Sequence, residues 1–233
     1  MMSVDALALV NLLPIALLGA VCGLDVVSFP QAMISRPIVA ATLGGAFAGN
    51  AGIGLLVGAT LELIALETLP IGASRYPEWG SASVAAGALA GSAPGHAGHI
   101  LAVSVLAALA TAWVGSWTML GLRRWNAARA RAHLAALESG GASTIVGLQL
   151  WGLTADLARG GVLTFVALAA FRPVMAAAAA HWSVEPGTSR AIVVATAAAV
   201  AAAAVWKVFH LTSGTRWLFC GGLALGITLL VWR

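Results

Sequence analysis

Charged residues are scarce in this chain. Lys, Arg, Asp and Glu make up 9% of its 233 residues, whereas 61% belong to the hydrophobic set. A soluble domain carries about 25% charged residues, so this chain has too few charges to cover a surface that faces water. A soluble fold with a buried helical core is also excluded, because a chain of this length cannot hide so much apolar surface. The composition therefore predicts an integral membrane protein.

Residues that build metal centres, disulfide frameworks and catalytic sites are sparse as well. The two cysteines, Cys22 and Cys220, lie in or beside apolar runs at opposite ends of the chain, where cysteine acts as a small hydrophobe. The sequence has no Gly-rich phosphate loop followed by Lys. His96 and His99 fit an interfacial turn better than a metal pair. We therefore expect no catalytic residue, no metal and no cofactor.

The chain instead contains long runs of uncharged, mostly apolar residues. A helical span needs about 20 mostly apolar residues, so these runs predict an all-α bundle with six to eight membrane segments. The first run follows Asp5 with no basic segment, which predicts a retained span rather than a removable signal peptide, with a kink at Pro14. The runs cover residues 6–24, 37–61, 79–122 (divided at Pro94-Gly95), 139–155, 191–206 and 217–232.

A basic segment divides the chain into two halves. This segment contains four arginines: Arg123, Arg124, Arg129 and Arg131. By the positive-inside rule they indicate a cytoplasmic side, and they explain the chain's net charge of +4 without a nucleic-acid partner. We expect an N-terminal membrane half, a basic cytoplasmic loop with a short amphipathic helix, and a C-terminal membrane half. Their ranges are 1–122, 123–142 and 143–233, and the second half is expected to hold helices over 143–158, 160–182, 189–209 and 214–232.

The segment 24–37 is too short to cross a bilayer and too apolar for an ordinary loop. It predicts a re-entrant hairpin or an interfacial helix. Two short glycine-rich segments follow, over 38–49 and 51–69, and the turn signal Gly49-Asn50-Ala51-Gly52 joins them. Residues 70–80 combine charged and aromatic side chains suited to the membrane–water boundary or to a second re-entrant loop.

Polar side chains within the apolar runs are the candidate functional residues. A charge at mid-bilayer costs at least about 2.5–3.5 kcal/mol, so Glu62 must face protein, water or a ligand. It is either a ligand, ion or proton site or the partner of an arginine on another helix, such as Arg36 or Arg159. Asp156 and Arg159, three residues apart, predict an internal ion pair.

Asp25 and Gln31 lie in the 24–37 segment. A carboxylate and an amide together suit the hydroxyl groups of a sugar. The competing interpretations are a helix N-cap for Asp25 and a satisfied structural amide for Gln31, and both remain open.

These residues also carry a family resemblance. Leu24-Asp25, then Ser35-Arg36-Pro37-Ile38-Val39, then Gly58-Ala59-Thr60-Leu61-Glu62 resemble the N-terminal signature of the IIC subunits of mannose/fructose/sorbose phosphotransferase systems. The similarity is good over residues 20–90 and returns between Gln149 and Arg159. The family usually has Asp where this chain has Asn50.

The resemblance implies a sugar-translocating subunit that moves by an elevator-type mechanism in the bacterial inner membrane. It implies a IID membrane partner, cytoplasmic IIA and IIB proteins that carry out the phosphoryl transfer, a hexose substrate, and an oligomer for which a trimer is one option. The implied substrate-binding residues are Asp25, Gln31, Arg36, Glu62 and Asn50.

Two other functions stay open on the sequence. One is a structural or regulatory membrane subunit that kept this fold without transport. The other is an ion- or proton-coupled carrier that uses Glu62 directly.

Overall fold

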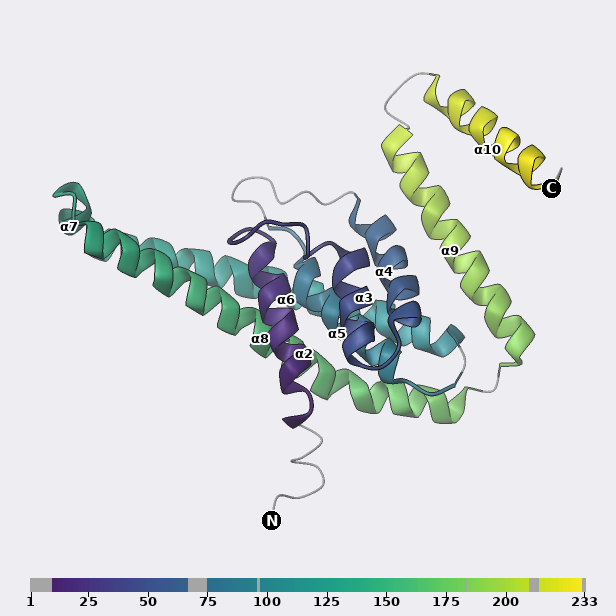
Figure 1. The fold of residues 1–233 in the computed structure, drawn as a ribbon, viewed down its shortest axis with the longest axis horizontal. Helices are drawn as coiled ribbons and strands as arrows, with labels where there is room; N and C mark the ends of the chain where they lie inside the picture. Colours follow the sequence, from purple (N-terminus) through teal and green to yellow (C-terminus); the bar gives the residue numbers. More distant parts are fainter. Residues whose placement is uncertain (1–9, 67–74, 96, 183, 210–213, 232–233) are drawn as a thin grey trace, which may run out of the picture.

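The protein is an assembly of helices (Figure 1). The computed structural model describes residues 10–66, 75–95, 97–182, 184–209 and 214–231, and within these ranges it contains no strand. The predicted all-helical architecture is therefore confirmed. The helices are α2 (Leu13–Asp25), α3 (Pro37–Phe47), α4 (Ala51–Ala65), α5 (Trp79–Ser92), α6 (Ala97–Ala132), α7 (Leu134–Glu138), α8 (Ala142–His181), α9 (Pro186–Phe209) and α10 (Thr215–Val231).

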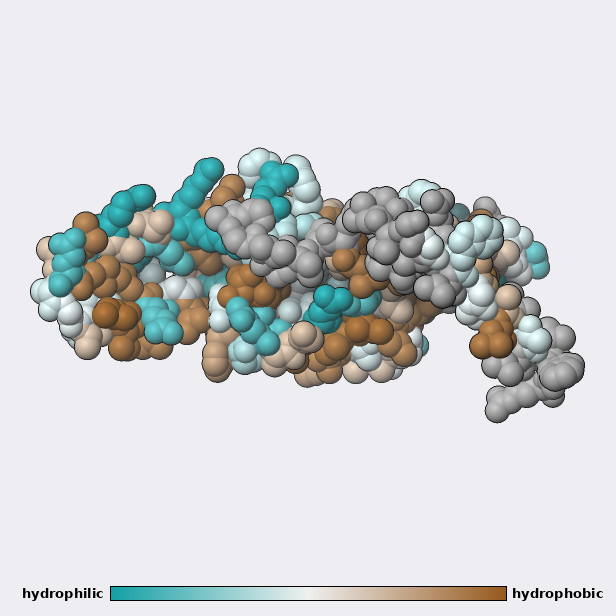
Figure 2. Space-filling view, turned by 90° about the horizontal axis from the view of Figure 1, so that it is seen from above, coloured by the Kyte–Doolittle hydropathy of each residue, from teal (hydrophilic) through white to brown (hydrophobic). Residues whose placement is uncertain are grey.

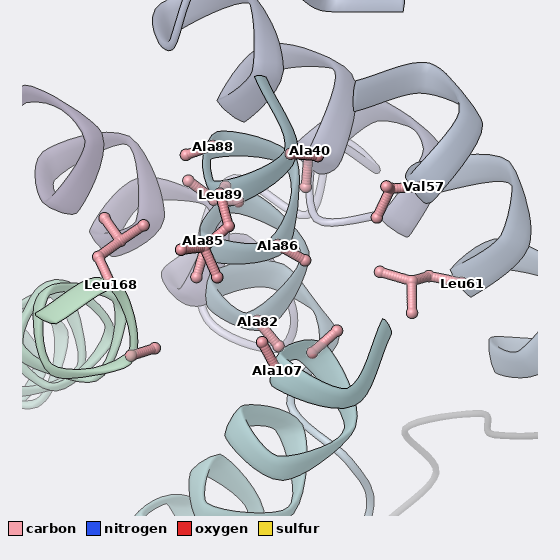
Figure 3. Close-up of a cluster of buried hydrophobic side chains, with 14 of the residues drawn as sticks. Ala40, Val57, Leu61, Ala82, Ala85, Ala86, Ala88, Leu89, Ala107 and Leu168 are labelled. Atoms are coloured by element: carbon pink, nitrogen blue, oxygen red, sulfur yellow. The ribbon is translucent and has the colours of Figure 1, made fainter. Parts of the chain in front are cut away.

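Helix α5 forms the centre of the bundle. All of its residues from Trp79 to Ala90 are buried, and α2, α3, α4, α6 and α8 pack around it. Figure 3 shows its alanines and Leu89 facing Leu168 on one side and Ala40, Val57 and Leu61 on the other. Because the side chains are mostly small, the helix backbones approach closely, as is usual where lipid supplies no hydrophobic drive for helix association.

Helices α3 and α5 approach each other closely in this core. A Cβ atom added to Gly87 would lie 2.0 Å from the carbonyl oxygen of Ala41, and one added to Gly44 would lie 2.3 Å from the carbonyl oxygen of Val84. Both distances are far below van der Waals contact. Only glycine fits at these two crossing points.

Helices α3 and α4 form a hairpin of half-length helices. Pro37 begins α3, Gly49 turns the chain with a φ of 105°, and the Asn50 side chain accepts a hydrogen bond from the Ile53 amide to cap α4. This confirms the predicted pair of short segments and the turn between them. With 11 and 15 residues, neither helix can cross a bilayer that requires about 20.

The segment before this hairpin is not helical. Residues 26–36 are non-helical, with turns and bends, so the interfacial-helix alternative was wrong, and the re-entrant segment stays a prediction. The predicted interruption near Pro14 has a counterpart in the described residues, because Asn11 and Leu12 form a turn between the helical Val10 and α2. Pro14 lies in the first turn of α2, where its missing N–H has no partner to lose.

Helices α6 and α8 are longer than expected, with 36 and 40 residues. The predicted basic loop is largely helix, because Arg123 to Arg131 continue α6 and only the five-residue α7 separates α6 from α8. The predicted break near residue 159 is absent as well. Gly160 lies within α8 and packs closely against α2. A Cβ atom added to it would lie 3.2 Å from the Ala20 Cα.

The two long helices project together beyond the bundle and meet at α7 (Figure 1). We call this projection the arm; it comprises residues 120–155. In Figure 2 hydrophilic side chains are frequent over the left half, which holds the arm, and apolar patches lie among them.

Three of the described helical segments are long and apolar enough to cross a membrane: Gly98–Ala132, Ala142–His181 and Pro186–Ala203. Six to eight membrane segments were expected. The count covers only the described residues, within which α2, α3, α4 and α5 are shorter apolar helices and 143–158 and 160–182 merge into one helix. The C-terminal helix α10 lies beyond α9 at the outside of the bundle (Figure 1).

Candidate functional site

The loop between α2 and α3 is held by Asp25, which is the last residue of α2. Its Oδ1 accepts a hydrogen bond from the Ala32 amide at 2.6 Å, and its Oδ2 accepts one from the Ser35 amide at 2.9 Å. Asp25 is 2% exposed, so both oxygens act inside the protein. Asp25 therefore holds amides of the loop, and the helix N-cap interpretation was wrong, because α3 begins at Pro37 and its N-cap is Arg36.

The loop backbone takes up sparsely populated conformations. Gln31 and Met33 have φ values of 59° and 62°, in the left-handed region that residues other than glycine rarely adopt. Such conformations persist where the surrounding structure holds them, and they are frequent at functional sites. The two hydrogen bonds to Asp25 supply that restraint here.

Arg36 and Glu62 form an ion pair that ties the end of this loop to α4. The Arg36 guanidinium donates to Glu62 Oε1, and the Ile38 amide donates to Oε2 at 3.2 Å. The side chains are 38% and 17% exposed, so the pair lies at the edge of the bundle rather than in its core. Of the alternatives considered for Glu62, the structure shows the ion pair with Arg36.

The structure brings Asp25, Arg36 and Glu62 together through one continuous set of contacts, and Gln31 lies on the same loop. The Gln31 side chain is exposed and donates to the Val27 carbonyl oxygen at 2.8 Å. Asn50 does not join them. It begins α4, twelve residues before Glu62, which corresponds to about 18 Å along a helix.

A second charged cluster lies deeper in the bundle, around Arg159. Arg159 Nε donates to Asp156 Oδ1 at 2.8 Å, which confirms the predicted ion pair, and Arg159 Nη1 lies 4.0 Å from Glu78 Oε2. Ser28 Oγ donates to Asp156 Oδ2 at 2.6 Å, so the cluster also holds the start of the loop. The Asp156 and Glu78 residues are each 1% exposed.

Glu78 was not singled out from the sequence. Its neighbours Arg75, Tyr76 and Trp79 made the segment look like a membrane–water boundary, whereas Glu78 is buried and caps α5 through the Ser81 amide at 3.1 Å. Glu78 Oε2 accepts no hydrogen bond from the described residues. The available signal was the position of an acid immediately before an Ala/Gly/Ser helix, which is an N-cap pattern.

A cavity of about 480 Å³ opens beside this cluster, between α6 and α8 at the base of the arm. Asp156 and Ser28 are among the residues that line it. Among the described residues no group of three or more His, Cys, Asp or Glu side chains is placed to hold a metal ion. The cavity is lined by Val27, Ser28, Met119, Leu122, Arg123, Asn126, Arg129, Ala130, Leu148, Gln149, Trp151, Gly152, Leu153 and Asp156.

Long apolar helices, a non-helical loop fixed by buried charges and a hairpin too short to cross together indicate a multi-pass helical membrane protein. The family model described as "PTS system sorbose-specific iic component" matches residues 9–184, and the chain belongs to this family. It is therefore a IIC sugar permease subunit of a phosphotransferase system, a class whose other parts are a IID membrane subunit and IIA and IIB proteins.

A solved structure supports the fold independently. The chain titled "Structure of membrane protein" is similar with a TM-score of 0.69 and 20% sequence identity, and the match covers 96% of this chain and 93% of that chain. At this identity the likeness concerns the fold alone. No curated protein matches the chain.

Proposed function

We propose that this subunit binds a hexose at the loop between α2 and α3 and passes it inward, where a IIB partner phosphorylates it, in a bacterial inner membrane. The observation that carries the proposal is the loop itself. Non-helical backbone at membrane depth occurs where it lines a cavity or is packed in protein, and it offers amides and carbonyls to a polar solute. Here it lies between α2 and a hairpin that does not cross the bilayer.

The proposed sugar contacts are Gln31, Arg36 and Glu62. The Gln31 side chain is exposed, and the Arg36–Glu62 pair is partly exposed, so a sugar could exchange hydrogen bonds with them. Asp25 would act on the sugar through the loop amides that it positions, since both of its oxygens already accept hydrogen bonds. Asn50 would act at the far end of the hairpin, where it sets the start of α4.

An elevator-type movement requires surfaces that can pass one another. The α3–α4 hairpin packs on α5 mainly through small residues, among them Gly44, Gly45 and Gly87. In this proposal the hairpin and its loop would move with the sugar, and the long helices α6 and α8 would belong to the fixed scaffold.

The test is hexose binding to the Glu62→Gln variant of the full-length chain, purified with its IID partner. Losing a charged hydrogen-bond acceptor is expected to weaken hexose binding by about tenfold or more. Glu138→Gln is the matched control, because Glu138 is exposed on α7 and its substitution makes the same chemical change.

Thermal melting of the same samples separates loss of the site from loss of the fold, because Glu62→Gln also removes the ion pair with Arg36. A melting temperature like that of Glu138→Gln together with weakened hexose binding supports the assignment. Unchanged hexose affinity in Glu62→Gln would overturn it.

One observation favours a second function, that of a subunit with this fold but without transport. The carboxylates of Asp25 and Glu62 accept hydrogen bonds from protein donors at all four oxygens. Uptake of labelled hexose by cells that also contain the IID, IIA and IIB proteins distinguishes the two. A subunit without transport would give no phosphorylated hexose inside the cell.

A further inference from the structure

The basic end of α6 contains a feature that sugar passage does not explain. The Arg129 guanidinium lies over the ring of Trp151 at 4.8 Å and near the ring of Trp125 at 5.9 Å. The two indoles themselves pack edge to face at 5.6 Å. Arg129 makes no ion pair with a described carboxylate, and its buried Nε has no hydrogen-bond partner among the described residues. The guanidinium is thus oriented by aromatic rings while its donors stay available.

Arg129 lines the 480 Å³ cavity between α6 and α8. Arg123, Asn126 and Gln149 line the same cavity, so two guanidinium groups and two amides border one space. The lining contains one carboxylate, Asp156, against two guanidinium groups, and Asp156 already accepts from Arg159 at 2.8 Å and from Ser28 at 2.6 Å. The net character of the cavity is therefore that of an anion site.

The donor set fits a phosphate group. Arginine presents a planar fork of donors that matches phosphate oxygens, and stacking on aromatic rings holds the fork in place. The positive-inside rule predicts that this end of α6 faces the cytoplasm, and basic pockets between membrane helices on that side bind phosphate headgroups.

We propose that the cavity at the base of the arm binds a phosphate ester, with Arg129 as the principal contact. Two sources carry this chemistry at the cytoplasmic side: the headgroup of an anionic phospholipid and a sugar phosphate. The proposal does not depend on the hexose site at the α2–α3 loop, and binding of a phosphate probe is measured separately from binding of a hexose.

The experiment uses the full-length chain with its IID partner in phosphatidylcholine nanodiscs. The first measurement adds phosphatidylglycerol and counts retained lipids by native mass spectrometry. The second adds labelled glucose 6-phosphate, with glucose as the uncharged comparison. For whichever probe binds, Arg129→Gln is expected to weaken its binding by about tenfold, the effect of losing charged hydrogen bonds.

Arg131→Gln is the matched control, because Arg131 is an exposed arginine of the same helix that does not line the cavity. Its effect is expected to stay below about twofold, since salt screens an exposed charge. Arg129→Lys keeps a cation beside the indoles but loses the planar fork of donors, so intermediate binding is expected. It also gives a folded variant if Arg129→Gln lowers the melting temperature.

The two measurements distinguish a lipid headgroup from a sugar phosphate. Retention of phosphatidylglycerol that Arg129→Gln abolishes identifies a lipid headgroup site, and loss of glucose 6-phosphate binding identifies a sugar-phosphate site. Either result supports the proposal. Equal losses in Arg129→Gln and Arg131→Gln, or no binding of either probe above the uncharged comparisons, would overturn it.

Discussion

The core around α5 and the arm formed by α6, α7 and α8 differ in how they use apolar residues. In the core, small side chains are buried and the backbones nearly touch, as at Gly87 and Ala41. In the arm, large apolar residues are exposed, with Leu150 at 58% and Trp151 at 42% exposure. Apolar composition alone therefore does not tell packing inside the chain from surface that lipid or another subunit covers.

The largest difference should appear at the buried charges of the core. Arg159→Met leaves Glu78 and Asp156 buried without their cation, which is expected to destabilise the protein by about 3–5 kcal/mol. The measurement is the melting temperature and the monodisperse fraction in detergent. Arg190→Met, on the exposed side of α9, is the control. Equal stability of the two variants would show that the cluster is hydrated and contributes little.

A smaller but still marked effect is expected from Gly87→Leu. Its Cβ would meet the Ala41 carbonyl oxygen at 2.0 Å, so α3 and α5 must separate, at a cost of about 2–3 kcal/mol. Gly121→Leu is the comparison in α6, because an added Cβ at Gly121 meets nothing within 4 Å. Chemical denaturation of both variants gives the difference. A tolerated leucine at Gly87 would mean that the α3–α5 contact is looser than described.

The smallest effect is expected in the arm. Leu150→Gln changes an exposed side chain, so the stability of the purified chain should change by no more than about 0.5 kcal/mol. Co-purification with the IID partner is measured in parallel. A loss of stability as large as that of Gly87→Leu would contradict the contrast, because it would show that the arm is packed within the chain itself.

Local chemistry allowed the half-length hairpin to be predicted. Pro37, Gly49 and Asn50 act within a few residues of their own positions, and the structure uses them as a helix start, a turn and a cap. The ion pair of Asp156 and Arg159 was predictable for the same reason, since three residues of helix bring the two side chains to one face.

Features that depend on distant partners were not predictable in the same way. The sequence was divided between 143–158 and 160–182, whereas α8 runs through this point and Gly160 packs against α2. Glu78 acquires its role from Arg159, eighty-one residues later, and from the α5 helix that it caps. The sequence indicated Arg36 as one of two partners for Glu62, and the fold brings that arginine to α4 through the loop that Asp25 fixes.

The length of α6 constrains how the subunit can sit in a bilayer. A helix of 36 residues is about 54 Å long, while the hydrocarbon core is about 30 Å thick. Membrane helices tilt by at most about 40°, and at that angle α6 would still extend about 41 Å along the membrane normal. At no tilt in this range does the whole of α6 fit within the hydrocarbon core. At least one end of α6 must therefore extend beyond the hydrocarbon core, and the arginines make its C-terminal end the one suited to water and lipid headgroups.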